Sequence, residues 1–253
     1  MAERIHMKPI YTQTFLIDDM SVDCFGRLKL SALLYYAQTA AGKHSDLLGA
    51  DYDTLALRRL FWAVTRHRVK ITRLPVRGET ITVETWPMPT TKVAYPRSMV
   101  AYDDQGNELF RSISLWVLMD LDQRTMVLPG KSGVTVDGSL TGSELAVPKS
   151  IMPKTMSNTD MRRVTYSCLD RNGHMNNTRY LDWVDDLLSG SFHSSHSARE
   201  FIICYHSEAR ESQQIYLNWE LSENGFLQVD AHREKTDVSG SQDRVFSAQV
   251  LFK

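Results

Sequence analysis

The 253-residue sequence contains few cysteines, no long hydrophobic run and almost no net charge. Only Cys24, Cys168 and Cys204 occur, and this odd, widely spaced set offers neither a disulfide framework nor a CxxC motif. No apolar stretch approaches the roughly 18 residues of a transmembrane helix. The net charge of −1 gives no general attraction for nucleic acid. We therefore expect a protein of a reducing compartment with no membrane and no nucleic-acid partner.

The remaining composition is that of a folded globular protein. Hydrophobic residues make up 42% and charged residues 23%, which is enough apolar material for a sizeable core. The first residues, Met-Ala-Glu-Arg-Ile-His, show neither a signal-peptide core nor the Arg- and Ser-rich character of a transit peptide. These features predict a cytoplasmic location.

The same order of elements is predicted twice along the chain. In the first half a strand precedes a long helix over 31–48, with Ser31 as N-cap and Gly49 as the residue after the helix. In the second half a strand at 161–168 precedes a helix over 176–188. The other expected strands cover 11–17, 61–74, 80–88, 93–103, 108–121, 200–206, 213–221, 226–234 and 244–252.

Consecutive strands joined by short polar turns favour antiparallel pairing, so the expected fold class is α+β. Residues 129–160 hold much of the Gly, Ser, Thr and Pro and are predicted to form a linker. We therefore expect an N-terminal domain over 1–128 and a C-terminal domain over 161–253, each with one long helix.

A polar stretch directly before the second helix is the strongest functional signal. Asp170, Asn172 and His174 alternate along it, which would put their side chains on one side of an extended segment. All are also turn-formers, so a loop that only caps the helix is the structural alternative.

Backbone groups of the same stretch suit an oxyanion. Asn176 and Asn177 are expected to cap the helix, and Gly173 lies just before them. Free N–H groups and the positive end of the helix dipole would meet there.

The stretch has a counterpart in the first half at a constant offset in the numbering. Asp23 and Gly26 match the aspartate and glycine of the later copy, but Phe25 and Arg27 stand where it has asparagine and histidine. A purely structural loop has no reason to differ at just these positions. We interpret the pair as a duplication in which only the C-terminal copy kept an active site.

The second half carries two motifs, in order, that together resemble those of the fatty acyl-ACP thioesterase family. Residues 170–180 read Asp-x-Asn-x-His-x-Asn-Asn-x-x-Tyr, and residues 205–210, Tyr-His-Ser-Glu-Ala-Arg, are similar to the family's Tyr-Arg-Arg-Glu-Cys-Gly-Arg segment. The resemblance covers nearly the whole chain and implies two tandem hotdog domains, in each of which an antiparallel sheet wraps a long central helix. The acyl pocket would lie in the N-terminal half, which has no active site of its own.

The resemblance also implies a mechanism and partners. Glu208 falls on the family's catalytic glutamate and would activate a water, while Asn172 and His174 would bind the water or the thioester oxygen. His174 could instead protonate the leaving thiolate, and Asp170 would fix the loop. The implied partner is acyl carrier protein (ACP), the implied cofactors and metals are none, and the unit would be a monomer or a homodimer of the double hotdog.

Two departures from the family pattern are informative. The family position often written as a catalytic cysteine is Ala209, so a thiolate nucleophile is excluded there. Plant members carry a plastid transit peptide, and the absence of one indicates a bacterial-type member.

Two basic clusters and a histidine pair are further candidate sites. Arg66, Arg68 and Lys70 share one face of a predicted strand and could dock an acidic carrier, although a solvated strand face is equally ordinary. The pair at 162–163, Arg-Arg, is a second docking candidate. His193 and His196 have a metal-compatible spacing, but they lie in a serine-rich stretch that we expect to be a loop.

Other functions remain compatible with these residues. An acyl-CoA thioesterase differs only in the substrate carrier. A hotdog hydratase or dehydratase would use an Asp and a His before the helix but would not need Glu208. A non-catalytic acyl-binding module would need none of the four polar side chains.

Overall fold

A computed structural model describes residues 9–233 and 243–253. Its strands are β1 (Tyr11–Leu16), β2 (Leu60–Ile71), β3 (Thr80–Pro87), β4 (Tyr95–Tyr102), β5 (Glu108–Asp120), β6 (Met126–Val127), β7 (Asn158–Arg163), β8 (Ala198–Tyr205), β9 (Gln214–Leu221), β10 (Phe226–Arg233) and β11 (Asp243–Phe252). Its helices are η1 (Asp19–Ser21), α1 (Leu30–Leu47), α2 (Tyr52–Leu57), α3 (Pro129–Ser132), η2 (Tyr166–Cys168), α4 (Arg179–Asp185) and α5 (Gly190–Ser195).

The strands of both halves form one continuous sheet. Its order is β1-β3-β4-β5-β2-β8-β11-β10-β9-β7, with β6 paired to β5. The junction is the antiparallel pairing of β2 with β8, in which Arg66 lies opposite Cys204 and Lys70 opposite Glu200. All strand pairs within the described part of the chain are antiparallel, as predicted.

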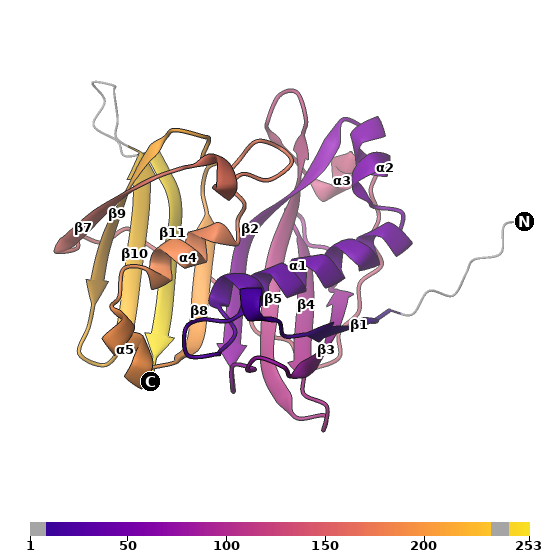
Figure 1. The fold of residues 1–253 in the computed structure, drawn as a ribbon. Coiled ribbons are helices and arrows are strands. Elements are labelled where there is room, and N and C mark those ends of the chain that lie inside the picture. The colour runs from indigo at the N-terminus through magenta and orange to yellow at the C-terminus, as the bar shows by residue number, and fades with distance from the viewer. Residues whose placement is uncertain (1–8, 234–242) are drawn as a thin grey trace, which may run out of the picture.

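The helices α1 and α4 lie against the same face of this sheet (Figure 1). The inward side of α1 is rich in alanine, including Ala37 and Ala40, which lets the helix approach the strands closely. Residues from the two halves share one hydrophobic core, for example Leu33 of α1, Tyr180 of α4 and Phe246 of β11. The predicted α+β class with a helix-wrapping sheet in each half is confirmed.

The predicted helix boundaries were only partly right. Ser31 is not the N-cap: α1 begins at Leu30, and Ser31 is buried inside the helix. Gly49 does follow the helix with φ +67°, a left-handed conformation that glycine adopts without strain. The second helix is much shorter than predicted, because α4 covers Arg179–Asp185 and not 176–188.

Short helices and one strand also differ from expectation. Both α2 and α5 were missed, and the serine-rich stretch with His193 is the helix α5 and not a loop. The strand predicted at 161–168 is β7 at Asn158–Arg163, followed by η2. Residue 234, the expected end of another strand, lies outside the described residues.

The segment after α3 crosses the outer face of the sheet as an irregular strap over 133–157. Carbonyl groups along it accept hydrogen bonds from arginines of β5, β2 and β11. The bonds run from Arg111 to Ser143 at 2.5 Å, from Arg66 to Pro148 at 3.1 Å and from Arg244 to Ile151 at 3.2 Å. The segment lacks regular structure over most of its length, but it is fastened to both halves.

Candidate active site

The two motifs of the second half meet through main-chain contacts. Residue His174 forms an isolated antiparallel bridge with Arg210, and the Met175 amide donates to the Ala209 carbonyl at 2.8 Å. Ala209 itself is fully buried in the core. This pairing brings His174, at the end of one motif, beside Glu208 in the other.

The stretch before α4 is a turn and not an extended segment, so the argument from alternation was wrong. Gly173 has φ +76°, and its amide donates to the Asp170 carbonyl at 3.0 Å. The Asp170 carboxylate accepts from the amides of Asn172 at 2.8 Å and His174 at 3.3 Å. Asp170 therefore fixes the loop backbone, while the two other side chains leave the turn in their own directions.

His174 and Glu208 are in direct contact. The imidazole Nε2 lies 3.1 Å from Glu208 Oε2, and the other carboxylate oxygen, Oε1, accepts from Arg124 Nη2. Arg124 Nη2 also lies 3.4 Å from His174 Nδ1. The three side chains form a closed triangle in which the imidazole faces a carboxylate on one nitrogen and a guanidinium on the other.

The protonation of His174 follows from this environment. Its side chain is 13% exposed, and burial is the main cause that lowers its pKa below 6.5. Glu208 opposes this shift by favouring the imidazolium, whereas Arg124 adds to it by repelling the charged ring. The net direction is downward, so His174 is neutral at neutral pH, with Nε2 as the donor to Glu208.

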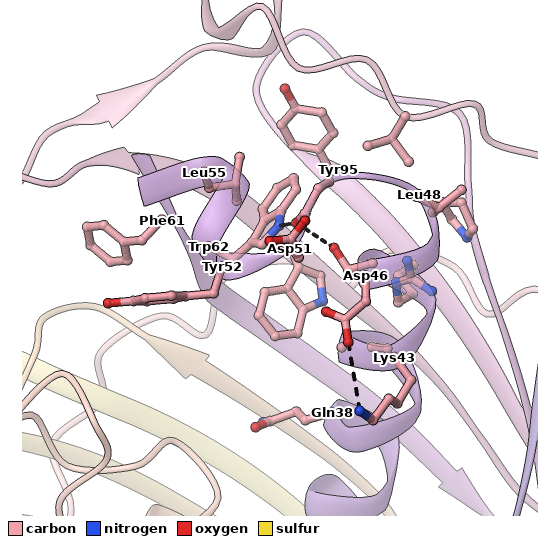
Figure 2. A pocket seen from close by; sticks show the side chains of 18 of the residues that line it. Gln38, Lys43, Asp46, Leu48, Asp51, Tyr52, Leu55, Phe61, Trp62 and Tyr95 are labelled. Carbon is pink, nitrogen blue, oxygen red and sulfur yellow. Dashed lines mark hydrogen bonds and ion pairs between the residues drawn. The ribbon is translucent and has the colours of Figure 1, made fainter. Parts of the chain in front are cut away.

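A cavity in the N-terminal half is connected to this triangle through Asn172 of the loop and through Phe61, over which Arg124 stacks. The cavity has a volume of about 500 Å³ and runs between α1, α2 and strands β2, β4 and β5. Figure 2 shows aromatic rings of Tyr52, Phe61, Trp62 and Tyr95 around it. Asn172 also lines this cavity, so the predicted site loop forms part of its wall.

Most of the predicted oxyanion groups are already occupied. The amides of Gly173 and Asn176 donate to the carbonyls of Asp170 and Cys168, at 3.0 and 2.8 Å. The Asn176 side chain caps Thr178 within the turn. The Asn177 side chain accepts from Gln38 of α1 at 2.9 Å, which ties the loop to the other half. The Asn172 carboxamide is the predicted donor that faces the cavity.

Two arginines of this site were missed by sequence reasoning. Arg124 comes from the turn between β5 and β6, has φ +55°, and stacks its guanidinium 4.5 Å above the Phe61 ring. Arg171 lies 3.4 Å above the Tyr52 ring and lines the cavity. A left-handed backbone conformation costs a non-glycine residue roughly 1–2 kcal/mol, and the sequence around Arg124 does not predict that conformation. Arg124 contacts Glu208 and His174, which both belong to the other half of the chain.

The face predicted to dock the carrier, formed by Arg66, Arg68 and Lys70, does not line the cavity. Arg66 and Arg68 point into the strap, and Arg68 pairs with Glu200 at 2.8 Å. Lys70 is exposed, but it lies opposite Glu200, at the end of β8 that is farther from Glu208. Of the second candidate pair, Arg162 is bonded to Asp160 at 3.3 Å on β7, the outermost strand of the other half. This placement does not favour either cluster as part of the cavity entrance.

Other possible sites give no further cluster. His193 bonds the Asp185 carbonyl at 3.0 Å, and His196 stacks on Phe192 at 4.2 Å. Across residues 9–233 and 243–253, no group of three or more His, Cys, Asp or Glu side chains is arranged to hold a metal ion. In the same ranges, no helix combines the length and hydropathy that a membrane span requires.

Comparison with known families agrees with this architecture. The acyl-ACP thioesterase N-terminal domain matches residues 8–128, and the acyl-ACP thioesterase C-terminal domain matches residues 151–245. The chain belongs to the acyl-ACP thioesterase family. The family resemblance seen in the motifs is thereby confirmed.

Individual relatives of this thioesterase family member are distant. It is 26% identical over 214 residues to a dodecanoyl-[acyl-carrier-protein] hydrolase of Cinnamomum camphora, covering 79% of this chain and 56% of the relative. It is 26% identical over 190 residues to a palmitoyl-acyl carrier protein thioesterase of Gossypium hirsutum, covering 69% and 46%. The chain thus spans about half the length of these curated relatives.

Solved structures share the whole fold. An acyl-ACP thioesterase from Bacteroides thetaiotaomicron superposes with a TM-score of 0.86 at 23% identity, covering 97% of this chain and 98% of that one. The 12:0-ACP thioesterase from Umbellularia californica gives a TM-score of 0.81 at 21% identity, with 98% of both chains covered. At these identities the likeness shows the tandem hotdog fold.

Proposed function

We propose that this protein hydrolyses the thioester of a fatty acyl-ACP to a free fatty acid and ACP. The observation that carries the proposal is the contact of His174 with Glu208 beside an acyl-sized cavity that Asn172 lines. Family membership supports the choice of ACP as carrier, since curated relatives are named for acyl-ACP hydrolysis.

In the proposed mechanism Glu208 is the general base. Its side chain is 41% exposed, so a water molecule can reach the carboxylate. The water oxygen attacks the thioester carbon and gives its proton to Glu208. The tetrahedral intermediate then collapses with cleavage of the C–S bond, and the leaving pantetheine thiolate takes the proton held by Glu208, which restores the carboxylate. His174 and Arg124 position the carboxylate during this sequence.

The oxyanion that forms on the thioester oxygen needs a hydrogen-bond donor. The Asn172 side chain lines the cavity, and within the described residues its one hydrogen bond is a long contact of 3.4 Å to Asp170 Oδ2. Its amide is therefore free to donate to the developing charge. Asp170 acts on the reaction only through the loop that it fixes.

The proposed domain roles follow from the same geometry. The N-terminal half over 1–128 would supply the acyl cavity, and the C-terminal half over 161–253 would supply the base, the imidazole and the oxyanion donor. Arg124 modifies this division, because the N-terminal half also contributes one side chain to the reacting end.

Release of free thiol from acyl-ACP and acyl-CoA, at matched concentration and chain length, tests the proposal. We expect hydrolysis of both, with the higher kcat/KM for acyl-ACP. A clear preference for acyl-CoA would favour the acyl-CoA thioesterase reading. Addition or removal of water at the acyl chain without thiol release would favour a hydratase or dehydratase.

A further inference from the structure

One cationic side chain of the cavity wall, that of Arg97, has no carboxylate partner among residues 9–233 and 243–253. Arg97 lies on β4 and lines the cavity beside α1. Its strand neighbours on the same face, Met99 and Ala101, belong to the main core, so Arg97 points toward the interior side of the sheet. Burial lowers its pKa to about 10, which still leaves the guanidinium charged at neutral pH.

The contacts of Arg97 use only one of its terminal nitrogens. Nη1 lies 3.1 Å from His44 Nδ1 and donates to Thr85 Oγ1 at 3.3 Å. Both partners are neutral, since burial and the Arg97 charge lower the pKa of His44 to about 4. Within the described residues, Nε and Nη2 have no hydrogen-bond partner and no carboxylate lies within 4.0 Å.

Other arginines of this chain use the Nε–Nη2 edge of the guanidinium, which is free in Arg97, to bind both oxygens of a carboxylate. Arg111 binds Glu108 through Nε and Nη2, and Arg59 binds Asp122 in the same way. This side-on geometry is the fork that recognises a carboxylate with two parallel hydrogen bonds. In Arg97 the same fork is empty.

The carboxylates of the cavity wall do not fill that fork. Asp46 pairs with Lys43 at 3.9 Å, and Asp51 caps α2 through Thr54. Figure 2 shows the Lys43–Asp46 pair on α1. A partly buried charge without a counter-charge is costly, and such groups concentrate where a ligand supplies the missing partner.

We propose that Arg97 binds a carboxylate at the far end of the acyl chain, so that the preferred substrates are thioesters of α,ω-dicarboxylic acids. This rests on the proposed thioesterase function, because the cavity would hold the chain whose thioester meets Glu208. The ω-carboxylate would accept from Nε and Nη2, while the aromatic wall of the cavity covers the methylene groups between the two ends.

Hydrolysis of matched substrates tests the proposal. Methyl-ended acyl-ACPs from octanoyl to hexadecanoyl are compared with ω-carboxyl chains of the same lengths and with their ω-methyl esters. We expect the best ω-carboxyl substrate to exceed its methyl-ended match about tenfold or more in kcat/KM, as a charge-assisted bidentate pair predicts. Arg97→Met should abolish this preference, and Arg97→Lys should keep only part of it.

Binding of the free acids supplies a readout that does not depend on catalysis. Titration calorimetry with wild-type protein should show the diacid binding about tenfold tighter than the monoacid of equal length, and Arg97→Met should remove the difference. Arg111→Met is the matched control, since it removes an arginine whose fork is already paired outside the cavity. It should leave both preferences intact.

The outcomes separate the two proposals. If no thioester is hydrolysed but the diacid preference in binding persists, the proposed function fails and the Arg97 site stands. If methyl-ended chains are hydrolysed equally well or better and diacids bind no tighter, the Arg97 site is rejected. Longer methyl-ended chains accepted only by Arg97→Met would instead make Arg97 a stop at the end of the cavity.

Discussion

The two copies of the loop before a helix have nearly the same backbone and different chemistry. In both, an aspartate accepts from two amides of its own turn: Asp23 from Phe25 and Arg27, both at 2.9 Å, and Asp170 from Asn172 and His174 at 2.8 and 3.3 Å. The glycine that follows has φ +75° in the first copy and +76° in the second. The shared residues of the motif are therefore structural, and the differing ones carry the proposed chemistry.

The side chain after the glycine makes the contrast clear. Arg27 donates to the His193 carbonyl at 2.8 Å and to Ser197 Oγ at 2.9 Å, so it binds the first loop to the second half. His174 at the matching position faces Glu208 and Arg124. One copy of the loop thus holds the halves together, and the other places an imidazole against Glu208 while its Asn172 lines the cavity.

The largest expected effect sharpens this contrast. We expect His174→Ala to lower kcat by about a hundredfold or more, because it removes the Nε2 contact that positions the base Glu208, whose own contribution is of that size. Arg27→Ala should leave kcat within about twofold, but it should lower the free energy of unfolding by about 1–2 kcal/mol, because it removes hydrogen bonds of a charged group. Steady-state kinetics and urea denaturation of both variants check this. Equal losses of turnover in two folded variants would contradict a single C-terminal site.

The repeated loop before each helix could be predicted from the sequence, but the contacts between the two halves could not. The loop repeat and the strand predicted over 213–221, observed as β9 at Gln214–Leu221, depend on local patterns and were recognised directly. The pairing of Arg124 with Glu208 joins residues 84 positions apart, and nothing in the neighbourhood of either residue announces it.

The errors in the helices have local causes. The second helix was predicted too long because Asn176 caps a turn at Thr178, one residue before α4. The short helix α2 carries a readable signal, since Asp51 accepts from the Thr54 amide at 2.9 Å as an N-cap aspartate does. The apolar pattern of six residues is too short to show a helical period. The unpaired state of Arg97 depends on the packing around it and has no sequence signature.

Arg124 offers a second test of the difference between the two loops. It contacts His174 in the second loop, whereas Arg27, at the matching position of the first loop, bonds His193 and Ser197. Arg124→Gln should raise the pKa of His174, since the guanidinium now helps to lower it. The acid limb of the pH–rate profile should move to higher pH, and kcat at neutral pH should fall about tenfold for a lost positioning contact to Glu208. NMR titration of the His174 ring measures the shift.

The matched control for this test is Arg59→Gln. Arg59 also has a left-handed backbone, with φ +57°, but it pairs with Asp122 and has no contact with His174. It should leave the His174 titration unchanged. An unchanged His174 pKa in Arg124→Gln would remove Arg124 from the site.

A third test concerns a buried histidine at the junction of the halves. His67 of β2 is buried between Trp116 and Tyr205, and neither ring nitrogen has a hydrogen-bond partner in the part of the chain that the structure describes. Burial lowers its pKa to about 3. The His67 ring of the unfolded chain binds a proton near pH 6.5, whereas that of the folded chain stays neutral. The free energy of unfolding therefore decreases as pH falls below that value. Between pH 7 and pH 5 we expect this residue to cost about 2 kcal/mol. His67→Leu should remove that part of the acid destabilisation in urea titrations; an identical pH dependence would show that His67 is protonated in the folded state.

The smallest expected effect concerns the carrier. Arg171 lies at the cavity with the catalytic loop, whereas Lys70 lies toward the other end of the sheet junction. Arg171→Ala should raise KM for acyl-ACP a few-fold at low salt, and this effect should shrink at high salt because exposed charges are screened. Lys70→Ala should raise it less. A larger increase in KM for Lys70→Ala than for Arg171→Ala would instead favour Arg66, Arg68 and Lys70 as the docking surface.

The central claim is that Glu208, held by His174 and Arg124, activates the water that hydrolyses an acyl-ACP. The most direct measurement is single-turnover release of fatty acid from acyl-ACP by wild type and Glu208→Gln, with the fold of the variant checked by circular dichroism. The isosteric amide keeps the size of the side chain and removes the base. We expect Glu208→Gln to lower the rate of the chemical step by about a hundredfold or more. A folded Glu208→Gln variant with a rate near that of wild type would contradict it.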